Sequence, residues 1–318
     1  MELTEIYHKG ESILQEKEYG FLLNYVETGY VKVNDRRVLD RYTIRQRCID
    51  AEPAQTAVSV LGVQLSSPVV MSAMTMPIPA MAEDALFQLA QGLKSAGSLM
   101  WTGTPLPKNL KQLADSGVPL AANVKPLKDR DRMLAEIDEI LESGADWLGI
   151  EVDAGQGTKV RDKEMGFDCI PFTTKEIAEI KKRVDIPLAC KGILSSEDAE
   201  KCVDAGADLI VVSNHGGHTL DYLPHPLQVL DEIVAAVNDR ITIMVDGSFR
   251  RGSDVFKGLA LGASLIGLGR PILYALAAGG ESAVTDLING IGRELARLMT
   301  MAGATACDRI NQDALIVA

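Results

Sequence analysis

Residues 186–217 read IPLACKGILSSEDAEKCVDAGADLIVVSNHGG, two apolar runs separated by one helical pattern. The runs at 186–191 and 209–214 are almost wholly apolar without strict alternation, which is typical of parallel strands buried on both faces. Between them, 196–205 has the spacing of an amphipathic helix, with serine at its start and Gly206 after its end. The stretch therefore predicts a strand–helix–strand unit.

The same alternation continues on both sides of this unit. Further apolar runs of four to seven residues lie at 69–74, 98–103, 120–124, 147–153, 241–247 and 265–270. Helical patterns lie at 131–143, 175–184, 226–238 and 253–261, and a last one at 281–301 closes the ring. Eight strands alternating with helices predict an α/β fold of the (β/α)8 TIM barrel type, with a doubly wound open sheet as the alternative.

The first 68 residues do not follow the repeat. Residues 5–26 have a helical pattern, 40–50 are charged, and 57–65 (AVSVLGVQL) indicate a hairpin around Gly62. We expect segment 1–68, helix and hairpin together, to cap the N-terminal mouth of a barrel formed by 69–318. No break in composition indicates a second domain, so we expect residues 1–318 to form a single domain.

The composition excludes several classes of protein. The chain of 318 residues has 32 Lys and Arg against 44 Asp and Glu, and its net charge of −12 argues against a nucleic-acid-binding surface. No apolar run approaches the ~18 residues of a membrane span, and the acidic N-terminus does not resemble a signal peptide. The five cysteines are scattered without CxxC spacing, which argues against disulfides and a metal site. We therefore expect a cytoplasmic protein that binds no nucleic acid, membrane or metal.

Three polar side chains suited to catalysis lie at predicted strand ends. The active sites of (β/α)8 barrels lie at the C-terminal ends of the strands. Asp153, Lys191 and His215 end or directly follow three of these runs. His215 suits a general base that the Asp153 carboxylate holds in one tautomer. Lys191 suits either a cation that stabilises an anionic cofactor or a Schiff-base nucleophile, and the residues alone leave both roles open.

Glycine-arginine loops follow the last two predicted strands. They read DGSFRRG at 246–252 and GLGRP at 267–271. Glycines let the backbone approach an anion closely, and Arg250 and Arg270 can add charge-assisted hydrogen bonds. Because barrels often bind phosphate at these two loops, the pattern predicts a phosphate-bearing cofactor or substrate.

Four ordered motifs carry a resemblance to a known family: KGIL (191–194), SNHGG (213–217), DGSFRRGSDVFK (246–257) and GLGRP (267–271). With them the chain resembles the FMN-dependent α-hydroxy-acid oxidase and dehydrogenase family, which includes glycolate oxidase, lactate oxidase and flavocytochrome b2. The resemblance implies FMN as the cofactor, His215 as the base acting on the substrate hydroxyl or α-carbon, and Asp153 as the group that stabilises its imidazolium. It places Lys191 near the N1–C2=O edge of the flavin. The residues that it implies in cofactor binding are Ala73, Met74, Thr75, Asn123, Glu151, Lys191, Ser213, Asp246, Gly247, Ser248, Arg250, Gly269 and Arg270.

The chain departs from the family where the substrate binds. The arginine of the family's HGGR motif, which clamps the substrate carboxylate, is His218 here, and a substrate tyrosine is Lys125. A neutral histidine cannot replace an always-charged bidentate arginine. We hypothesise that Lys125 and Arg161 provide the anionic anchor instead. The predicted substrate-binding residues are Lys125, Arg161, His215 and His218.

The resemblance predicts an FMN-dependent enzyme that oxidises a small anionic 2-hydroxy acid, or a related hydroxy compound, to the 2-oxo product. One alternative is an FMN-dependent isomerase similar to type 2 isopentenyl-diphosphate isomerase, and another is a Schiff-base lyase using Lys191. A non-enzymatic flavin-binding relic is a third alternative, although it would not be expected to keep His215, Asp153 and Lys191 together. Since relatives in this family form tetramers or octamers, we expect a homotetramer or a higher homo-oligomer.

Overall fold

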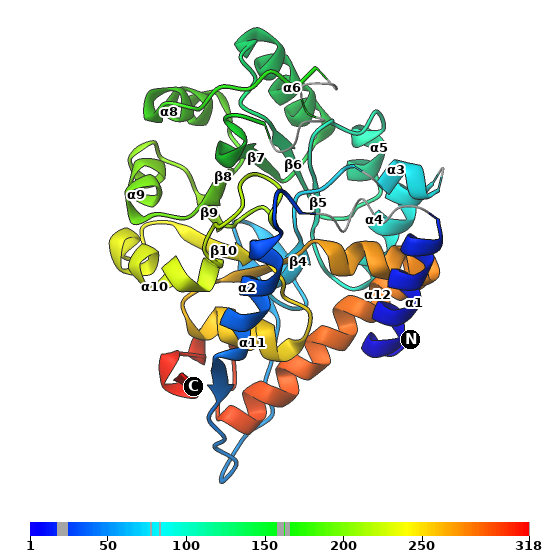
Figure 1. The fold of residues 1–318 in the computed structure, drawn as a ribbon, viewed down its shortest axis with the longest axis vertical. Helices are drawn as coiled ribbons and strands as arrows, with labels where there is room; N and C mark the ends of the chain where they lie inside the picture. Colours follow the sequence, from blue (N-terminus) through cyan, green and yellow to red (C-terminus); the bar gives the residue numbers. More distant parts are fainter. Residues whose placement is uncertain (18–24, 77, 83, 158–161, 163–165, 318) are drawn as a thin grey trace.

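The computed structural model, which describes residues 1–17, 25–76, 78–82, 84–157, 162 and 166–317, contains a ring of eight parallel strands (Figure 1). They are paired in the order β4, β11, β10, β9, β8, β7, β6, β5. Backbone hydrogen bonds from Met71 to Leu99 and from Met74 to Trp101 join the two ends of this order. The predicted (β/α)8 barrel is confirmed, and the open sheet is wrong. The strands are β4 (Val69–Met71), β5 (Met100–Thr102), β6 (Leu120–Val124), β7 (Trp147–Glu151), β8 (Leu188–Ile193), β9 (Leu209–Val212), β10 (Thr242–Asp246) and β11 (Leu265–Leu268).

Helices between the strands surround the barrel, and their ends follow ordinary capping chemistry. The Ser195 hydroxyl accepts from the Asp198 amide at the start of α9, and Gly144 ends α6 in the left-handed conformation. The last helix changes direction at Gly279 and Gly280, so the predicted helix at 281–301 is its second half. The helices are α3 (Ile78–Met81), α4 (Ala85–Ser95), α5 (Leu110–Asp115), α6 (Arg130–Ser143), α8 (Thr174–Arg183), α9 (Ser196–Asp204), α10 (Pro226–Val237), α11 (Gly252–Ala260) and α12 (Arg270–Ala302).

The predicted hairpin closes the N-terminal mouth of the barrel. Strands β2 (Val58–Val60) and β3 (Val63–Leu65) pair antiparallel around Gly62. Val63 and Leu65 pack with apolar side chains from inside the barrel, and the indole of Trp147 donates a hydrogen bond to the Leu61 carbonyl. This core inside the barrel is separate from the larger one between the strands and the helices.

The two N-terminal helices do not lie with the hairpin, so that part of the cap prediction is wrong. Helix α1 (Leu3–Glu16) packs along α12, and residues 18–24 of the expected helix at 5–26 lie outside the described part of the chain. Helix α2 (Tyr30–Asp40) lies at the C-terminal ends of the strands, at the other mouth of the barrel from the hairpin (Figure 1). Asp35 of α2 is buried and needs hydrogen-bond donors, which Asn214 after β9 and Ser248 after β10 provide.

The charged segment that follows α2 contains a strand that sequence reasoning missed. Strand β1 (Tyr42–Ile44) pairs antiparallel with β12 (Leu315–Val317) near the C-terminus. Two short 3-10 helices, η3 (Cys307–Arg309) and η4 (Gln312–Ala314), precede β12. Within the described ranges, no helix is both long enough and apolar enough to cross a membrane.

Candidate active site

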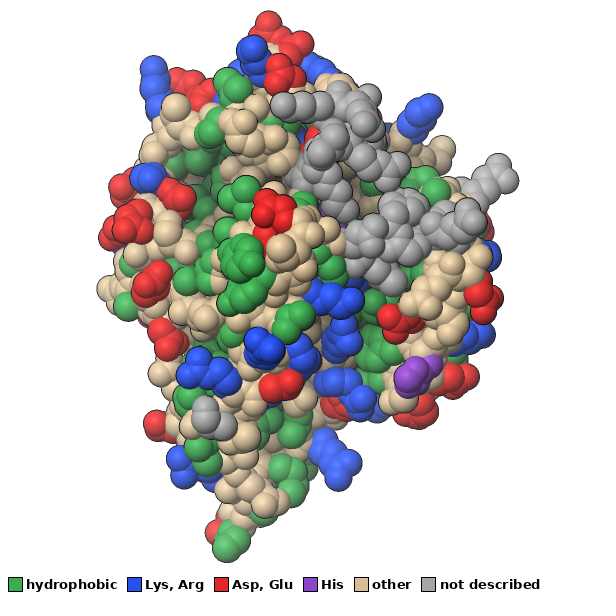
Figure 2. Space-filling view, viewed as in Figure 1, with side chains coloured by type: hydrophobic (Ala, Val, Ile, Leu, Met, Phe, Trp, Pro, Cys, Tyr) green, Lys and Arg blue, Asp and Glu red, His purple; other side chains and the backbone are tan. Residues whose placement is uncertain are grey.

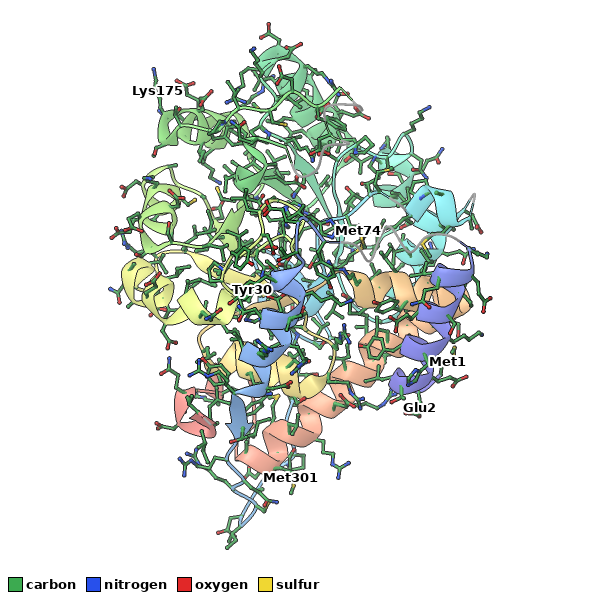
Figure 3. The ribbon with its side chains drawn as sticks, in the orientation of Figure 1. Met1, Glu2, Tyr30, Met74, Lys175 and Met301 are labelled. Atoms are coloured by element: carbon green, nitrogen blue, oxygen red, sulfur yellow. The ribbon has the colours of Figure 1, made fainter. Side chains whose placement is uncertain are left out.

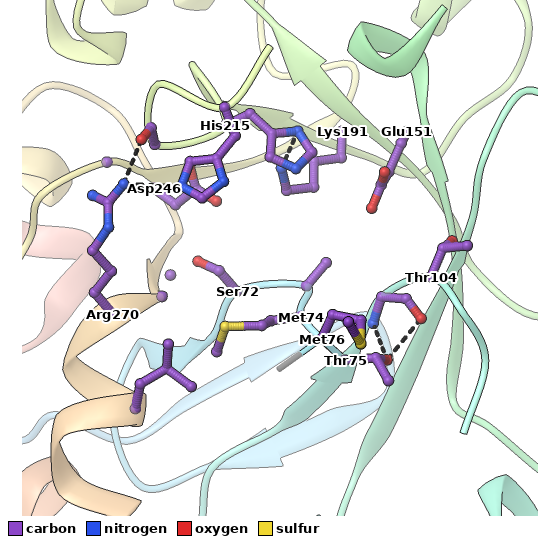
Figure 4. A pocket seen from close by; sticks show the side chains of 18 of the residues that line it. Ser72, Met74, Thr75, Met76, Thr104, Glu151, Lys191, His215, Asp246 and Arg270 are labelled. Carbon is purple, nitrogen blue, oxygen red and sulfur yellow. Dashed lines mark hydrogen bonds between the residues drawn. The ribbon is translucent and has the colours of Figure 1, made fainter. Parts of the chain in front are cut away.

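A cavity opens at the C-terminal ends of the strands, and its wall is formed by the ends of the barrel strands and the segments that follow them (Figure 4). Met74, which lines the cavity, and Tyr30 at the start of α2 both lie near the middle of the view in Figure 3. In Figure 2, a group of Lys and Arg side chains lies at and just below the middle of the face toward the viewer, with a few Asp and Glu side chains near them. The residues of the cavity wall that the sequence predicted are Ala73, Met74, Thr75, Lys125, Glu151, Lys191, His215, His218, Asp246, Gly247, Ser248, Arg250, Gly269 and Arg270.

His215 lines the cavity and forms a hydrogen-bonded pair with Asp153, which is not one of the lining residues. Nδ1 of His215 lies 2.8 Å from Oδ2 of Asp153, and both side chains are largely buried. Burial by itself raises the pKa of Asp153, but the neighbouring His215 and Lys191 hold it below its usual value. With the carboxylate accepting at Nδ1, the ring's other nitrogen, Nε2, is left as the basic atom.

Glycine makes the approach of Asp153 possible. Gly192 has a φ of +99°, and a Cβ atom at this position would lie 2.2 Å from Cγ of Asp153. His215 itself has a φ of 53°, and its amide donates to the Ser213 hydroxyl at 3.1 Å. Ser213 is fully buried, so the turn that presents the histidine is held from inside the barrel.

Lys191 lies between this pair and the rest of the cavity. Its Nζ is 3.4 Å from Nδ1 of His215 and 3.4 Å from the Ser213 hydroxyl. Burial by itself lowers the pKa of Lys191, yet Asp246, Asp153 and Glu151 raise it above its ordinary value. Lys191 is therefore held as a cation, which suits stabilisation of an anion and opposes the neutral amine that a Schiff base requires.

The loops after β10 and β11 bring the predicted anion-binding residues together. Gly247 and Ser248 both have positive φ values, and the Ser248 hydroxyl donates to Asp35 at 3.0 Å. The Arg270 guanidinium donates to the Gly216 carbonyl at 2.5 Å and contacts Nε2 of His218 at 3.1 Å. Nε of Arg270 is buried and has no hydrogen-bond partner among the described residues.

The segment after β4 forms the opposite wall of the cavity. Thr75 donates to the Gly103 carbonyl at 2.8 Å and accepts from the Gly103 amide at 3.0 Å, which fixes this segment against the end of β5. A Cβ at Gly103 would lie 3.3 Å from Met74. Ala73, Met74 and Thr75 therefore form a backbone platform whose shape depends on this glycine.

Lys125 has partners that the sequence analysis did not anticipate. Its Nζ lies 2.5 Å from Oδ2 of Asp162 and 3.9 Å from Oε2 of Glu151, and the three side chains are buried. Asn123 lies under them, donating to Oε1 of Glu151 at 3.4 Å and accepting from the Trp101 indole at 2.7 Å. The expected anchor for an anionic substrate is thus already ion-paired. Arg161, the second expected anchor, lies outside the described residues.

Several polar or aromatic residues at this site were missed by sequence reasoning. Arg270 lies 4.2 Å above the ring of Tyr25, and Asp35 supports the loop after β10. The buried His225 has a pKa lowered to about 4, mainly by burial, and its Nε2 bonds to the Gly247 carbonyl at 3.0 Å. None of these residues follows a predicted strand directly, so the search along strand ends could not find them. Asp162, which pairs with Lys125, was missed for the same reason.

Comparison with known proteins identifies the family. The profile of the FMN-dependent dehydrogenase family matches residues 11–171 and 169–317. The chain belongs to this family.

Members of the FMN-dependent dehydrogenase family with known activities resemble the chain over nearly its whole length. An L-lactate oxidase of Lactobacillus jensenii is 30% identical, over 97% of this chain and 83% of the relative. A glycolate oxidase of Spinacia oleracea is 26% identical, over 98% and 95%. A solved structure of a mandelate oxidase variant with (S)-mandelic acid superposes with a TM-score of 0.91 at 28% identity, covering 100% of this chain and 98% of that one. These relatives are FMN oxidases, and they do not favour the isomerase alternative.

The residues at the cavity fit FMN, the cofactor of the family. Arg250, Arg270 and the N-terminus of α12 suit the phosphate of FMN, and the buried Nε of Arg270 has no partner among the described residues. A Cβ at Gly269 would have no atom within 4 Å, so there is open space beside this loop. The backbone platform at 73–75 and the cationic Lys191 suit the flat ring system of FMN. Cationic side chains therefore lie both where the phosphate of FMN would bind and where its ring would bind.

Proposed function

We propose that this member of the FMN-dependent dehydrogenase family oxidises a small 2-hydroxy acid to the 2-oxo acid, with His215 as the base. The single observation that carries the proposal is the 2.8 Å contact of Asp153 with His215, which lines the cavity. The L-lactate, glycolate and mandelate oxidases among the relatives support the class of substrate.

The paired histidine performs the proton transfer. Nε2 of His215 takes the proton of the substrate hydroxyl or α-carbon, and the charge that develops on the ring is stabilised by Asp153 at Nδ1. When bound, FMN would supply the acceptor for the two electrons that leave the substrate and for the second hydrogen of its CH–OH group. Lys191, held as a cation beside His215, stabilises negative charge that forms in the cavity.

The remaining wall binds the two anions. We assign Asp246, Gly247, Ser248, Arg250, Gly269 and Arg270 to the ribityl phosphate arm of FMN, and the platform at 73–75 with Asn123, Glu151 and Ser213 to its ring. Lys125, His215 and His218 are the proposed contacts of the substrate, since all three line the cavity. We also propose that the protein works in the cytoplasm as a homotetramer or a higher homo-oligomer.

Anaerobic titration with a panel of 2-hydroxy acids tests the proposal. The purified protein reconstituted with FMN should lose its visible flavin absorbance with at least one of lactate, glycolate, mandelate or a longer acid. His215→Asn should bind FMN and be reduced by dithionite but not by that acid, whereas His8→Asn, which changes an exposed histidine of α1, should behave as the wild type. If no acid reduces a flavin that dithionite does reduce, the proposed substrate class is wrong.

A further inference from the structure

Glu151 has a buried carboxylate oxygen with no hydrogen bond. The residue is 3% exposed and ends β7 at the wall of the cavity. Among the described residues, none donates a hydrogen bond to Oε2, and Lys125 approaches it only to 3.9 Å. A buried charged acceptor without a donor keeps the full cost of having lost its water, so a ligand that donates to it is favoured. In Figure 4 the carboxylate points into the open space of the cavity, so a ligand there can supply the missing donor.

Glu151 is the middle member of a row across three neighbouring strands. In the register of the barrel Glu151 lies beside Lys191 of β8, and Ile150 lies beside Val124, so Lys125 comes next to Glu151 on the other side. Across the cavity wall the row therefore runs from the cation Lys191 to the carboxylate of Glu151 and on to the cation Lys125. Lys191 is held charged partly by Glu151 itself, and Lys125 is fixed in place by Asp162. A ligand complementary to this row has an acceptor, a donor and an acceptor along one edge.

We propose that Glu151 accepts the imide N3–H of the isoalloxazine ring, with Lys191 and Lys125 flanking it toward the two ring carbonyls. The imide edge of FMN carries C2=O, N3–H and C4=O in this order, which matches the row. The inference rests on the proposed function and makes Glu151 a positioning residue that selects the ring and sets its electrostatic environment. A carboxylate at this edge disfavours negative charge on the reduced ring, and the two lysines oppose that effect.

The competing source of the donor is the substrate. A hydroxyl, amide or ammonium group on a substrate could also donate to Oε2 of Glu151. The two sources share the same chemistry, but only the flavin is present before substrate is added. Measurements on the substrate-free protein therefore separate them.

Flavin affinity is the decisive measurement. The apoprotein is titrated with FMN and with N3-methyl FMN, which cannot donate at N3, and binding is followed by quenching of flavin fluorescence. The wild type should bind the methylated analogue at least about tenfold more weakly, as expected for the loss of one hydrogen bond to a charged group. Glu151→Leu should bind both flavins within about threefold of each other, and Glu139→Gln, an exposed change on α6, should keep the discrimination.

The midpoint potential of the bound flavin gives a second test that does not depend on how well Glu151→Leu folds. Glu151→Gln keeps an acceptor but removes the charge, so the two-electron midpoint potential should shift to a less negative value than in the wild type. Equal affinity of the wild type for FMN and its methylated analogue, or an unchanged potential together with a changed KM, would overturn the inference and assign the donor to the substrate. Reduction of the flavin by a 2-hydroxy acid would then still support the proposed function.

Discussion

Replacing Asp35 by asparagine should stabilise the protein at neutral pH. Asp35 is fully buried on α2, where it accepts hydrogen bonds from Nδ2 of Asn214 at 2.8 Å and from the Ser248 hydroxyl at 3.0 Å. Burial raises the pKa of Asp35 from 3.8 to about 6, although these two hydrogen bonds oppose the rise. Asparagine keeps both contacts, because its carbonyl accepts from Asn214 and its amide can donate to the hydroxyl of Ser248.

The size and the pH dependence of the effect follow from this pKa. A carboxyl whose pKa is higher in the folded state binds protons more tightly there, so the wild type loses stability as the pH rises from 3.8 through 6. The loss is complete above that range and amounts to about 3 kcal/mol, since each pKa unit corresponds to about 1.36 kcal/mol. Asp35→Asn lacks this loss. Its advantage should be about 3 kcal/mol at pH 8 and about half as large at pH 5.

Urea unfolding of the apoprotein at pH 5 and pH 8 measures this difference. Asp40→Asn is the matched control, because Asp40 is an exposed carboxylate on the same helix and should change stability by less than about 1 kcal/mol at both pH values. The reasoning is refuted if Asp35→Asn is no more stable than the wild type at pH 8, or if its advantage does not grow between pH 5 and pH 8.

Three further changes test the groups around the cavity. Asp153→Asn should lower kcat/KM by about 10²–10⁴-fold with little change in FMN affinity, measured by stopped-flow flavin reduction, because the histidine loses the carboxylate that orients it. Gly192→Ala should show a loss of the same kind, since its Cβ would meet Cγ of Asp153 at 2.2 Å, whereas Gly144→Ala, at a φ of +83° with nothing within 4 Å, should keep full activity. Lys125→Met should lower the free energy of unfolding by about 3–5 kcal/mol because it removes the buried cation beside the carboxylates of Asp162 and Glu151, and adding Asp162→Asn should restore part of it in urea melts.

The barrel and the centre of its site were predictable because both depend on local patterns. A buried parallel strand followed by a glycine-capped helix is visible within about thirty residues, as it is at 186–217. Lys191 and His215 were found for the same reason, because each lies at the end of a visible strand. The strand register then brings residues far apart in the chain to one mouth, so that Asp153 reaches His215 without any local signal between them.

The contacts that sequence reasoning missed all bridge distant segments or lie away from strand ends. Asp35 occurs in a helix whose pattern does not show that its carboxylate contacts Ser248 in the loop after β10, 213 residues further along the chain. Asp162 lies in the long connection after β7, where no periodicity fixes its position. Because it pairs with Lys125, that lysine is not the unpaired cation that the sequence analysis expected as the anchor of the substrate. Helix α2 was not predicted from the sequence, and the whole segment 1–68 was placed at the N-terminal mouth, because no local pattern shows which surface a segment covers.

The distribution of charge within the cavity separates the two anions that the proposed function requires. At the α12 end, Arg250 and Arg270 line the wall, and the burial of Asp35 disfavours its charged form there. At the platform end the cations Lys125 and Lys191 are matched by the carboxylates of Asp162, Glu151 and Asp153. A strongly charged phosphate is therefore attracted to the arginine end, and the other end has no surplus of positive charge among its described residues. Selection of the substrate at that end must then depend on its shape and its hydrogen-bonding groups more than on charge, which distinguishes this pocket from one built around a paired arginine clamp.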